Sequence, residues 1–175
     1  MTEHAASVAE ATSDATAPQF TITRIFDAPR PLVWRAWTEQ ADAAAWWHPR
    51  GISIKPGSVA VDLRVGGRYA YTMVNPADGS EYPTAGVYRE IVEPERLVFT
   101  WGNPDDGDAP VITVTLRELD GDRTEMLFHL LGIAAAPGDE DVYDGWDSAF
   151  DVLAEHLDTG PDEPRADGTD TRGAR

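Results

Sequence analysis

The chain has 175 residues, of which 42% are hydrophobic and 26% charged, so a wholly disordered or collagen-like protein is excluded. It carries 31 Asp and Glu against 14 Lys and Arg, a formal net charge of −17. Such an acidic protein repels phosphates and anionic lipids, so we expect neither nucleic acid nor a membrane as its partner. The absence of cysteine excludes disulfides, thiolate nucleophiles and cysteine-based zinc sites.

The two ends of the chain differ in composition from its middle. Residues 1–18 contain no large apolar residue beyond Met1 and Val8, and residues 159–175 contain none. Such segments bury too little surface to offset their ordering entropy, so we expect two disordered tails around one domain at 19–158. The N-terminal residues lack the basic and apolar regions of a secretory signal, and no stretch reaches the roughly 18 apolar residues of a membrane-spanning helix. We therefore expect a cytoplasmic protein.

Alternating apolar residues predict a series of strands along this domain. Residues 19–26 form the first predicted strand, and prolines at 29 and 31 then favour a helix start. Two short helices are predicted at 31–38 and 41–47. Further strands, separated by turn residues, are predicted at 52–55, 59–63, 68–74, 82–92, 96–101, 111–119 and 124–131.

The last predicted element, residues 142–157, changes to helical spacing. Val142, Trp146, Phe150, Leu153 and Leu157 recur at intervals of three or four residues, with acidic residues between them. This pattern indicates an amphipathic helix of about five turns. Strands joined in sequence favour an antiparallel sheet, and a helix with one apolar face must cover one face of that sheet. The predicted fold class is therefore α+β.

Aromatic residues are the most informative feature of the composition, because the chain has six tryptophans and five tyrosines. They fill a core, or they line a cavity in which tyrosine hydroxyls and tryptophan N–H groups are the few polar groups. Strand alternation shows which rings share a face but does not decide between these alternatives. The candidate ligand-binding residues are Trp46, Tyr69, Tyr71, Met73, Tyr88, Phe99, Trp101, Trp146 and Phe150.

No cofactor-binding motif or catalytic constellation is evident, and we assign no cofactor, metal or catalytic residue. The four histidines are scattered, and no serine lies in a nucleophile elbow. His48, near the end of a predicted helix, fits a favourable interaction with the helix dipole better than acid–base chemistry. Asp62 and Glu90 could transfer protons from predicted strands, but ion pairing with nearby arginines is favoured, the candidates being Arg64, Arg68 and Arg89.

Six short segments follow one another along the predicted domain. They are 26–38 (FDAPRPLVWRAWT), 46–47 (WW), 62–69 (DLRVGGRY), 86–91 (GVYREI), 95–101 (ERLVFTW) and 145–146 (GW). In this order they resemble the family of activators of the heat-shock protein 90 ATPase, within the START-like (SRPBCC), birch-pollen-allergen-like superfamily. The resemblance implies a helix-grip fold, in which an antiparallel sheet wraps around a long C-terminal helix and leaves a cavity between them.

One position departs from the family pattern. Family members often carry a histidine late in the last strand, two residues before a glycine, where this chain has Leu130 before Gly132. Its own His129 lies one position earlier. Because neighbouring residues of a strand point to opposite faces, we expect the His129 imidazole to face away from the pocket.

Three functions are compatible with these observations. We favour a binding protein that holds a small apolar or aromatic molecule between the sheet and the C-terminal helix. The first alternative is a chaperone cofactor, or a protein that binds some other protein partner. Against the chaperone role, we expect no room in this chain for the separate N-terminal chaperone-binding domain of the similar eukaryotic proteins. The second is an enzyme of the same superfamily, such as a polyketide cyclase/dehydrase or a hydrolase. The lack of a convincing acid–base pair argues against catalysis.

Overall fold

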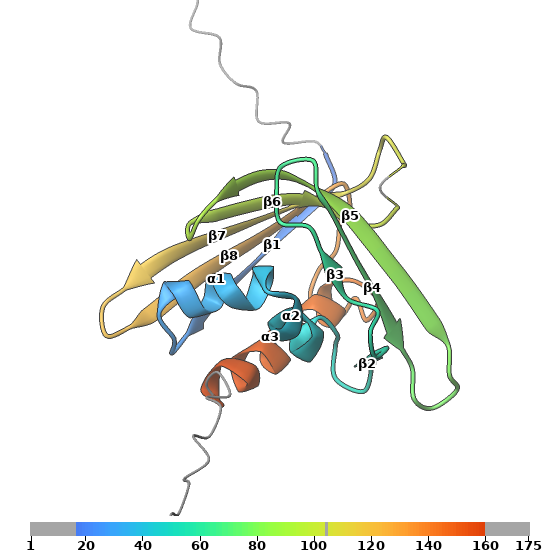
Figure 1. Ribbon diagram of the computed structural model, residues 1–175, viewed down its shortest axis with the longest axis horizontal. Helices are drawn as coiled ribbons and strands as arrows, with labels where there is room; N and C mark the ends of the chain where they lie inside the picture. Colours follow the sequence, from blue (N-terminus) through green and yellow to red (C-terminus); the bar gives the residue numbers. More distant parts are fainter. Residues whose placement is uncertain (1–16, 104, 160–175) are drawn as a thin grey trace, which may run out of the picture.

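The computed structural model describes residues 17–103 and 105–159, in which one antiparallel sheet curls over three helices (Figure 1). The predicted tails lie outside these ranges except for residues 17, 18 and 159. Of these, Pro18 accepts a hydrogen bond from the Gly132 N–H at 2.8 Å. None of the described helices is long and apolar enough to cross a membrane.

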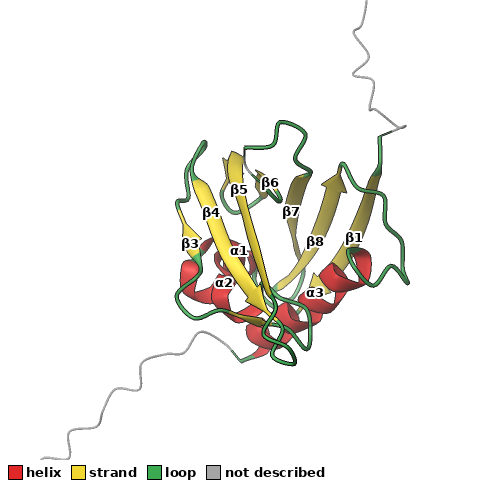
Figure 2. Cartoon of the chain, turned by 90° about the vertical axis from the view of Figure 1, so that its right-hand side faces the viewer, coloured by secondary structure: helices red, strands yellow, loops and turns green. Residues whose placement is uncertain are grey.

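Eight strands form the sheet in the order β1-β8-β7-β6-β5-β4-β2, with β3 also paired to β4, and every pairing is antiparallel. Figure 2 shows the strands curving around the helices. The strands are β1 (Gln19–Phe26), β2 (Ser53–Ile54), β3 (Ala60–Val61), β4 (Arg68–Val74), β5 (Glu81–Val92), β6 (Arg96–Thr100), β7 (Val111–Leu119) and β8 (Arg123–Leu131).

The helices lie inside the curve of the sheet (Figure 1). α1 (Arg30–Thr38) and α2 (Gln40–Trp46) follow β1, and α3 (Tyr143–Asp158) ends the described chain. α1 begins at the prolines as predicted, because Pro31 lies in its first turn, where its missing N–H costs no hydrogen bond. Together the antiparallel sheet and the long C-terminal helix confirm the predicted α+β helix-grip fold.

The core lies between the concave face of the sheet and the helices. Met126, Phe128 and Leu130 alternate along β8 and are fully buried, as the period-two pattern predicted. His129 points to the other face, where its Nε2 lies 2.8 Å from Gln19 Oε1. The expectation that this imidazole faces away from the pocket is therefore confirmed.

An arginine on the inner side of β1 ties the sheet to α3. The Arg24 guanidinium lies 2.7 Å from Asp147 Oδ1 and 2.9 Å from Asp151 Oδ1, one helical turn apart. Burial acts against the charged form of Arg24, but hydrogen bonds to the two carboxylates outweigh it and raise the pKa. This contact helps to set the position of α3, which forms one wall of the site described next.

Candidate ligand-binding site

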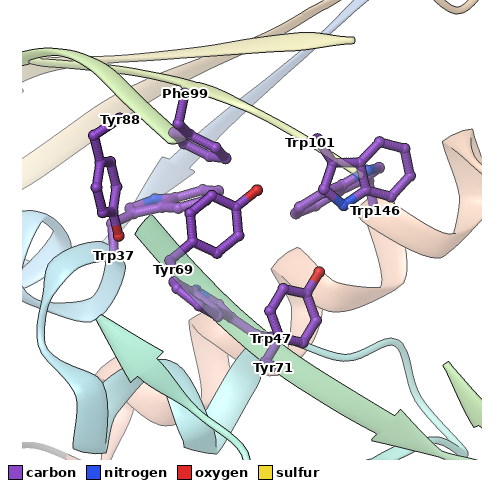
Figure 3. Close-up of a pocket in the computed structure, with 8 residues that line it drawn as sticks. All are labelled: Trp37, Trp47, Tyr69, Tyr71, Tyr88, Phe99, Trp101 and Trp146. Carbon is purple, nitrogen blue, oxygen red and sulfur yellow. The ribbon is translucent and has the colours of Figure 1, made fainter. Parts of the chain in front are cut away.

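A cavity lies between the curved sheet and α3, and all the side chains lining its inner chamber are aromatic (Figure 3). The inner chamber has a volume of about 10 Å³, which is room for about one water molecule. Its walls are Trp37, Trp47, Tyr69, Tyr71, Tyr88, Phe99, Trp101 and Trp146.

A larger outer chamber shares four of these side chains and leads to the surface. The volume of the outer chamber is about 80 Å³. Asp141, which is exposed, stands in its lining, so the chamber opens to solvent at the start of α3. The lining consists of Trp47, His48, Pro49, Tyr71, Met73, Trp101, Asp141, Val142, Gly145, Trp146 and Ala149.

The alternation of β4 directs Tyr69, Tyr71 and Met73 into this space. Tyr69 pairs with Gly86 on β5, and a Cβ atom at position 86 would lie 2.5 Å from Tyr69 Cε1 and 2.0 Å from the Thr100 carbonyl oxygen. Only glycine therefore lets the Tyr69 ring pack against the β5 backbone. There its hydroxyl donates a hydrogen bond to the Thr100 carbonyl oxygen at 2.6 Å.

The rings support one another in edge-to-face contacts. Tyr69 meets Phe99 with ring centroids 5.4 Å apart and Trp47 with centroids 5.7 Å apart. Trp101 meets Trp146 at 5.5 Å across the space between β6 and α3. Because such contacts fix ring orientation as well as distance, they give the cavity a defined wall.

The polar groups of this wall are indole N–H groups, which only donate, and phenol hydroxyls, which donate or accept. Within the described residues, Trp47 Nε1, Trp101 Nε1 and Tyr88 Oη are buried without a hydrogen-bond partner. Burial raises the pKa of the Tyr69 and Tyr71 hydroxyls; for Tyr71 the neighbouring Trp101 and Thr84 side chains oppose this shift. The phenols therefore stay protonated at neutral pH.

The structure brings together most of the predicted site residues. Tyr69, Tyr71, Met73, Tyr88, Phe99, Trp101 and Trp146 line one chamber or the other. Trp46 and Phe150 do not line either chamber. They are fully buried with ring centroids 6.2 Å apart, and Trp46 Nε1 donates to the Ala36 carbonyl oxygen at 2.8 Å.

Trp37 and Trp47 line the cavity but were not among the predicted site residues. Trp37 lies four residues after Val33 on the buried face of α1, a spacing that marks an inward position. Trp47 follows the last residue of α2 as its C-cap, so its ring leaves the helix in a different direction from that of Trp46. The paired tryptophans alone did not show which ring would enter the core and which the cavity.

Two of the three candidate acid–base residues form ion pairs, and the third lies beside a backbone carbonyl group. Asp62 is exposed and lies 2.9 Å from the Arg64 guanidinium, one of the arginines considered for it. Glu90 pairs at 3.0 Å with Arg96, which was not among them. His48 lies in the lining of the outer chamber, with Nδ1 3.0 Å from the Pro49 carbonyl oxygen.

Residues 27–158 match the protein family described as activator of Hsp90 ATPase homolog 1-like proteins. The chain belongs to this family. The match covers most of the domain and agrees with the family resemblance of the six sequence segments. None of the curated proteins matches the chain.

Solved structures of several other proteins share the fold. Protein CV1439 from Chromobacterium violaceum is 30% identical, with a TM-score of 0.68 over 78% of this chain and 95% of that one. Protein NE0264 from Nitrosomonas europaea is 25% identical, with a TM-score of 0.69 over 82% of this chain and 96% of that one. PFC0360w from Plasmodium falciparum, an HSP90 activator, is 23% identical with a TM-score of 0.51, covering 68% of this chain and 76% of that one, and shows likeness of fold alone.

Proposed function

We propose that this protein binds a small apolar or aromatic molecule in the cavity between the sheet and α3. The observation that carries the proposal is the aromatic inner chamber joined to a larger chamber that opens at Asp141. Sites for small molecules are typically apolar and concave, with a few polar groups that orient the ligand. Here those groups are the indole N–H and phenol groups of the wall.

The arrangement favours binding over catalysis. Asp62 and Glu90 are engaged in ion pairs outside the cavity. The titratable groups that do line the two chambers are His48, Asp141 and the three buried tyrosines. Asp141 is exposed and the tyrosines hold their protons, so this lining offers no buried acid–base pair close to the rings.

A substitution in the outer chamber tests the proposal. A Cβ atom at Gly145 would meet no other atom within 4 Å, so alanine fits without a clash, and we expect the longer leucine side chain to extend into the chamber that Gly145 lines. We expect a one-ring aromatic probe such as indole to bind the wild-type protein saturably, measured by calorimetry. Gly145→Leu should reduce its affinity at least tenfold, whereas Gly145→Ala, the matched control, should change it little.

Both Gly145 variants should be as stable as the wild type or more so, because glycine is a poor helix former. A loss of binding in Gly145→Leu is therefore attributable to the filled chamber rather than to unfolding. If the wild-type protein binds none of a panel of one-ring probes, or if Gly145→Leu binds as tightly as Gly145→Ala, the proposal fails.

A role as a chaperone cofactor is the second candidate. It is supported by the fold shared with the Plasmodium falciparum HSP90 activator and by two exposed apolar side chains, Leu63 and Val65, at 40% and 64% exposure. They project from the loop before β4, which is tied down by the Gly66 N–H bond to the Tyr88 carbonyl oxygen at 2.8 Å. Stimulation of Hsp90 ATPase activity, lost in a Leu63→Ser, Val65→Ser variant, would support this role.

A further inference from the structure

Two groups of tryptophans differ in how their indole N–H groups are satisfied. Away from the junction of the two chambers, Trp37 Nε1 lies 3.4 Å from Met126 Sδ and Trp46 Nε1 lies 2.8 Å from the Ala36 carbonyl oxygen. At the junction of the two chambers, Trp47 Nε1 and Trp101 Nε1 are buried but have no partner among the described residues. Buried donors are nearly always hydrogen-bonded, so these two N–H groups are where a bound hydrogen-bond acceptor would be most stabilised.

A ligand group that pairs with these N–H groups must be a hydrogen-bond acceptor, because an indole nitrogen only donates. Tyr71 adds a second polar group at the same place: its hydroxyl points toward Trp101 (Figure 3), but the two groups do not meet the geometry of a hydrogen bond. Burial raises the pKa of this hydroxyl more than the nearness of Trp101 lowers it, so the hydroxyl remains a neutral group able to donate. Together they form a spot suited to one oxygen atom, in a wall that is otherwise apolar.

The charges around the cavity restrict the ligand further. Among the described residues, no lysine or arginine lines either chamber, while the Asp141 carboxylate stands at the opening. The chain as a whole carries a formal net charge of −17. A carboxylate ligand would find no lysine or arginine as counter-charge, only the His48 imidazole of the outer chamber, and would be repelled by Asp141. A protonated amine could pair with Asp141 only at the opening, because the indole N–H groups at the junction offer it no acceptor.

We propose that the ligand is an uncharged aromatic molecule bearing a carbonyl-type acceptor, whose oxygen accepts a hydrogen bond from Trp101 Nε1. This inference rests on the proposed function and narrows the class of ligand. The ring occupies the outer chamber, which is the larger of the two, and the oxygen lies at the junction beside Tyr71. Aryl ketones and aryl aldehydes have this combination of groups.

A pair of probes with the same shape isolates the acceptor. Acetophenone and α-methylstyrene differ in that a C=CH₂ group replaces the C=O group. We expect acetophenone to bind the full-length protein about fivefold more tightly, the effect of one neutral hydrogen bond. In ¹⁵N-labelled protein it should shift the Trp101 indole N–H resonance downfield, whereas α-methylstyrene should not.

Two variants separate the hydrogen bond from the shape of the cavity. Trp101→Phe removes the unpaired N–H group and should bring the affinities for the two probes to within twofold of each other. Trp146→Phe is the matched control, because it removes the same atoms from another wall of both chambers. It should alter both affinities while preserving their ratio. If Trp101→Phe does not fold, the resonance shift in the wild-type protein decides the matter.

The outcomes distinguish this inference from the function on which it rests. If both probes bind equally, or if only other indole resonances shift, the cavity is a binding site but the proposed hydrogen bond from Trp101 Nε1 to the ligand is wrong. Binding of benzoate more tightly than acetophenone would overturn the requirement for an uncharged ligand. If no aromatic probe binds, both proposals fail.

Discussion

Tyr69 and Tyr88 lie on neighbouring strands of the same wall, but their hydroxyl groups have different environments. The Tyr69 hydroxyl donates to the Thr100 carbonyl oxygen at 2.6 Å, whereas the buried Tyr88 hydroxyl has no partner among the described residues. A buried hydrogen bond contributes modestly to stability, but loss of one partner leaves the other unsatisfied. The two hydroxyls should therefore contribute differently to the fold.

We expect Tyr69→Phe to lower the free energy of unfolding by about 1–2 kcal/mol, because it leaves the buried Thr100 carbonyl without its donor. Tyr88→Phe removes a hydroxyl that makes no hydrogen bond, so it should be neutral or slightly stabilising. Urea denaturation of the two variants measures both effects. Equal destabilisation by both substitutions would show that the hydrogen bond of Tyr69 is not what distinguishes them.

Gly86 is the residue on which the placement of Tyr69 depends. Because an added Cβ would lie 2.0 Å from a backbone oxygen, Gly86→Ala should force β5 and β6 apart and destabilise the protein by about 1–3 kcal/mol. Gly107→Ala is the control, since a Cβ there meets no atom within 4 Å and should have little effect. Thermal unfolding of both variants tests this, and an undiminished melting temperature in Gly86→Ala would contradict it.

The position of α3 determines the shape of the cavity. α3 is joined to β1 by Arg24 and to α2 by His156, whose Nε2 lies 3.0 Å from Asp42 Oδ1. Trp146, on the first half of the helix, closes both chambers. Contacts along the length of α3 therefore affect a site near its beginning.

We expect Arg24→Met to destabilise the protein by about 1–3 kcal/mol, because it removes charged hydrogen bonds to two aspartates from a partly buried position. Arg117→Met is the matched control, since its exposed guanidinium pairs with one carboxylate, that of Glu125, and should contribute less than about 0.5 kcal/mol. Urea denaturation compares them. Equal effects would show that Arg24 acts as an ordinary surface charge.

The elements themselves were largely predictable from the sequence, because each long strand and helix repeats one period over many residues. The predicted helix at 142–157 differs from the observed α3 by one residue at each end. Short strands were less predictable: the segments at 52–55 and 59–63 pair with β4 over only Ser53–Ile54 and Ala60–Val61. The predicted strand at 96–101 ends at Thr100, and the Trp101 N–H bonds to the Pro110 carbonyl oxygen in the following loop.

The sequence predicted which rings share a face but not how much space they leave. Tyr69 and Tyr71 were placed correctly on one side of a strand by alternation alone. Whether Trp46 fills the core or lines a cavity depends on the direction in which α2 ends and on where α3 lies. These are tertiary features with no local sequence signal, and a volume of this kind emerges only when the helices are in place.

The buried tyrosines also connect the cavity to the stability of the whole protein. Desolvation raises the pKa of Tyr69, Tyr71 and Tyr88 above the ordinary value of 10.0, and the Asp62 charge adds to the shift of Tyr88. The folded state therefore keeps protons that the unfolded state releases as the pH rises above about 10. Stability from this source is fully present below that pH and decreases above it.

Unfolding free energy should thus decline between pH 10 and 11, with each fully buried tyrosine contributing up to about 1.4 kcal/mol per pH unit. Urea denaturation at pH 9, 10 and 11 measures the decline, and absorbance at 295 nm reports when tyrosinate forms. Tyr88→Phe should make the decline less steep, because one of the three groups is gone while the fold is retained. If the three tyrosines instead ionise near pH 10 in the folded protein, the cavity wall is open to water and too polar for the apolar ligand proposed above.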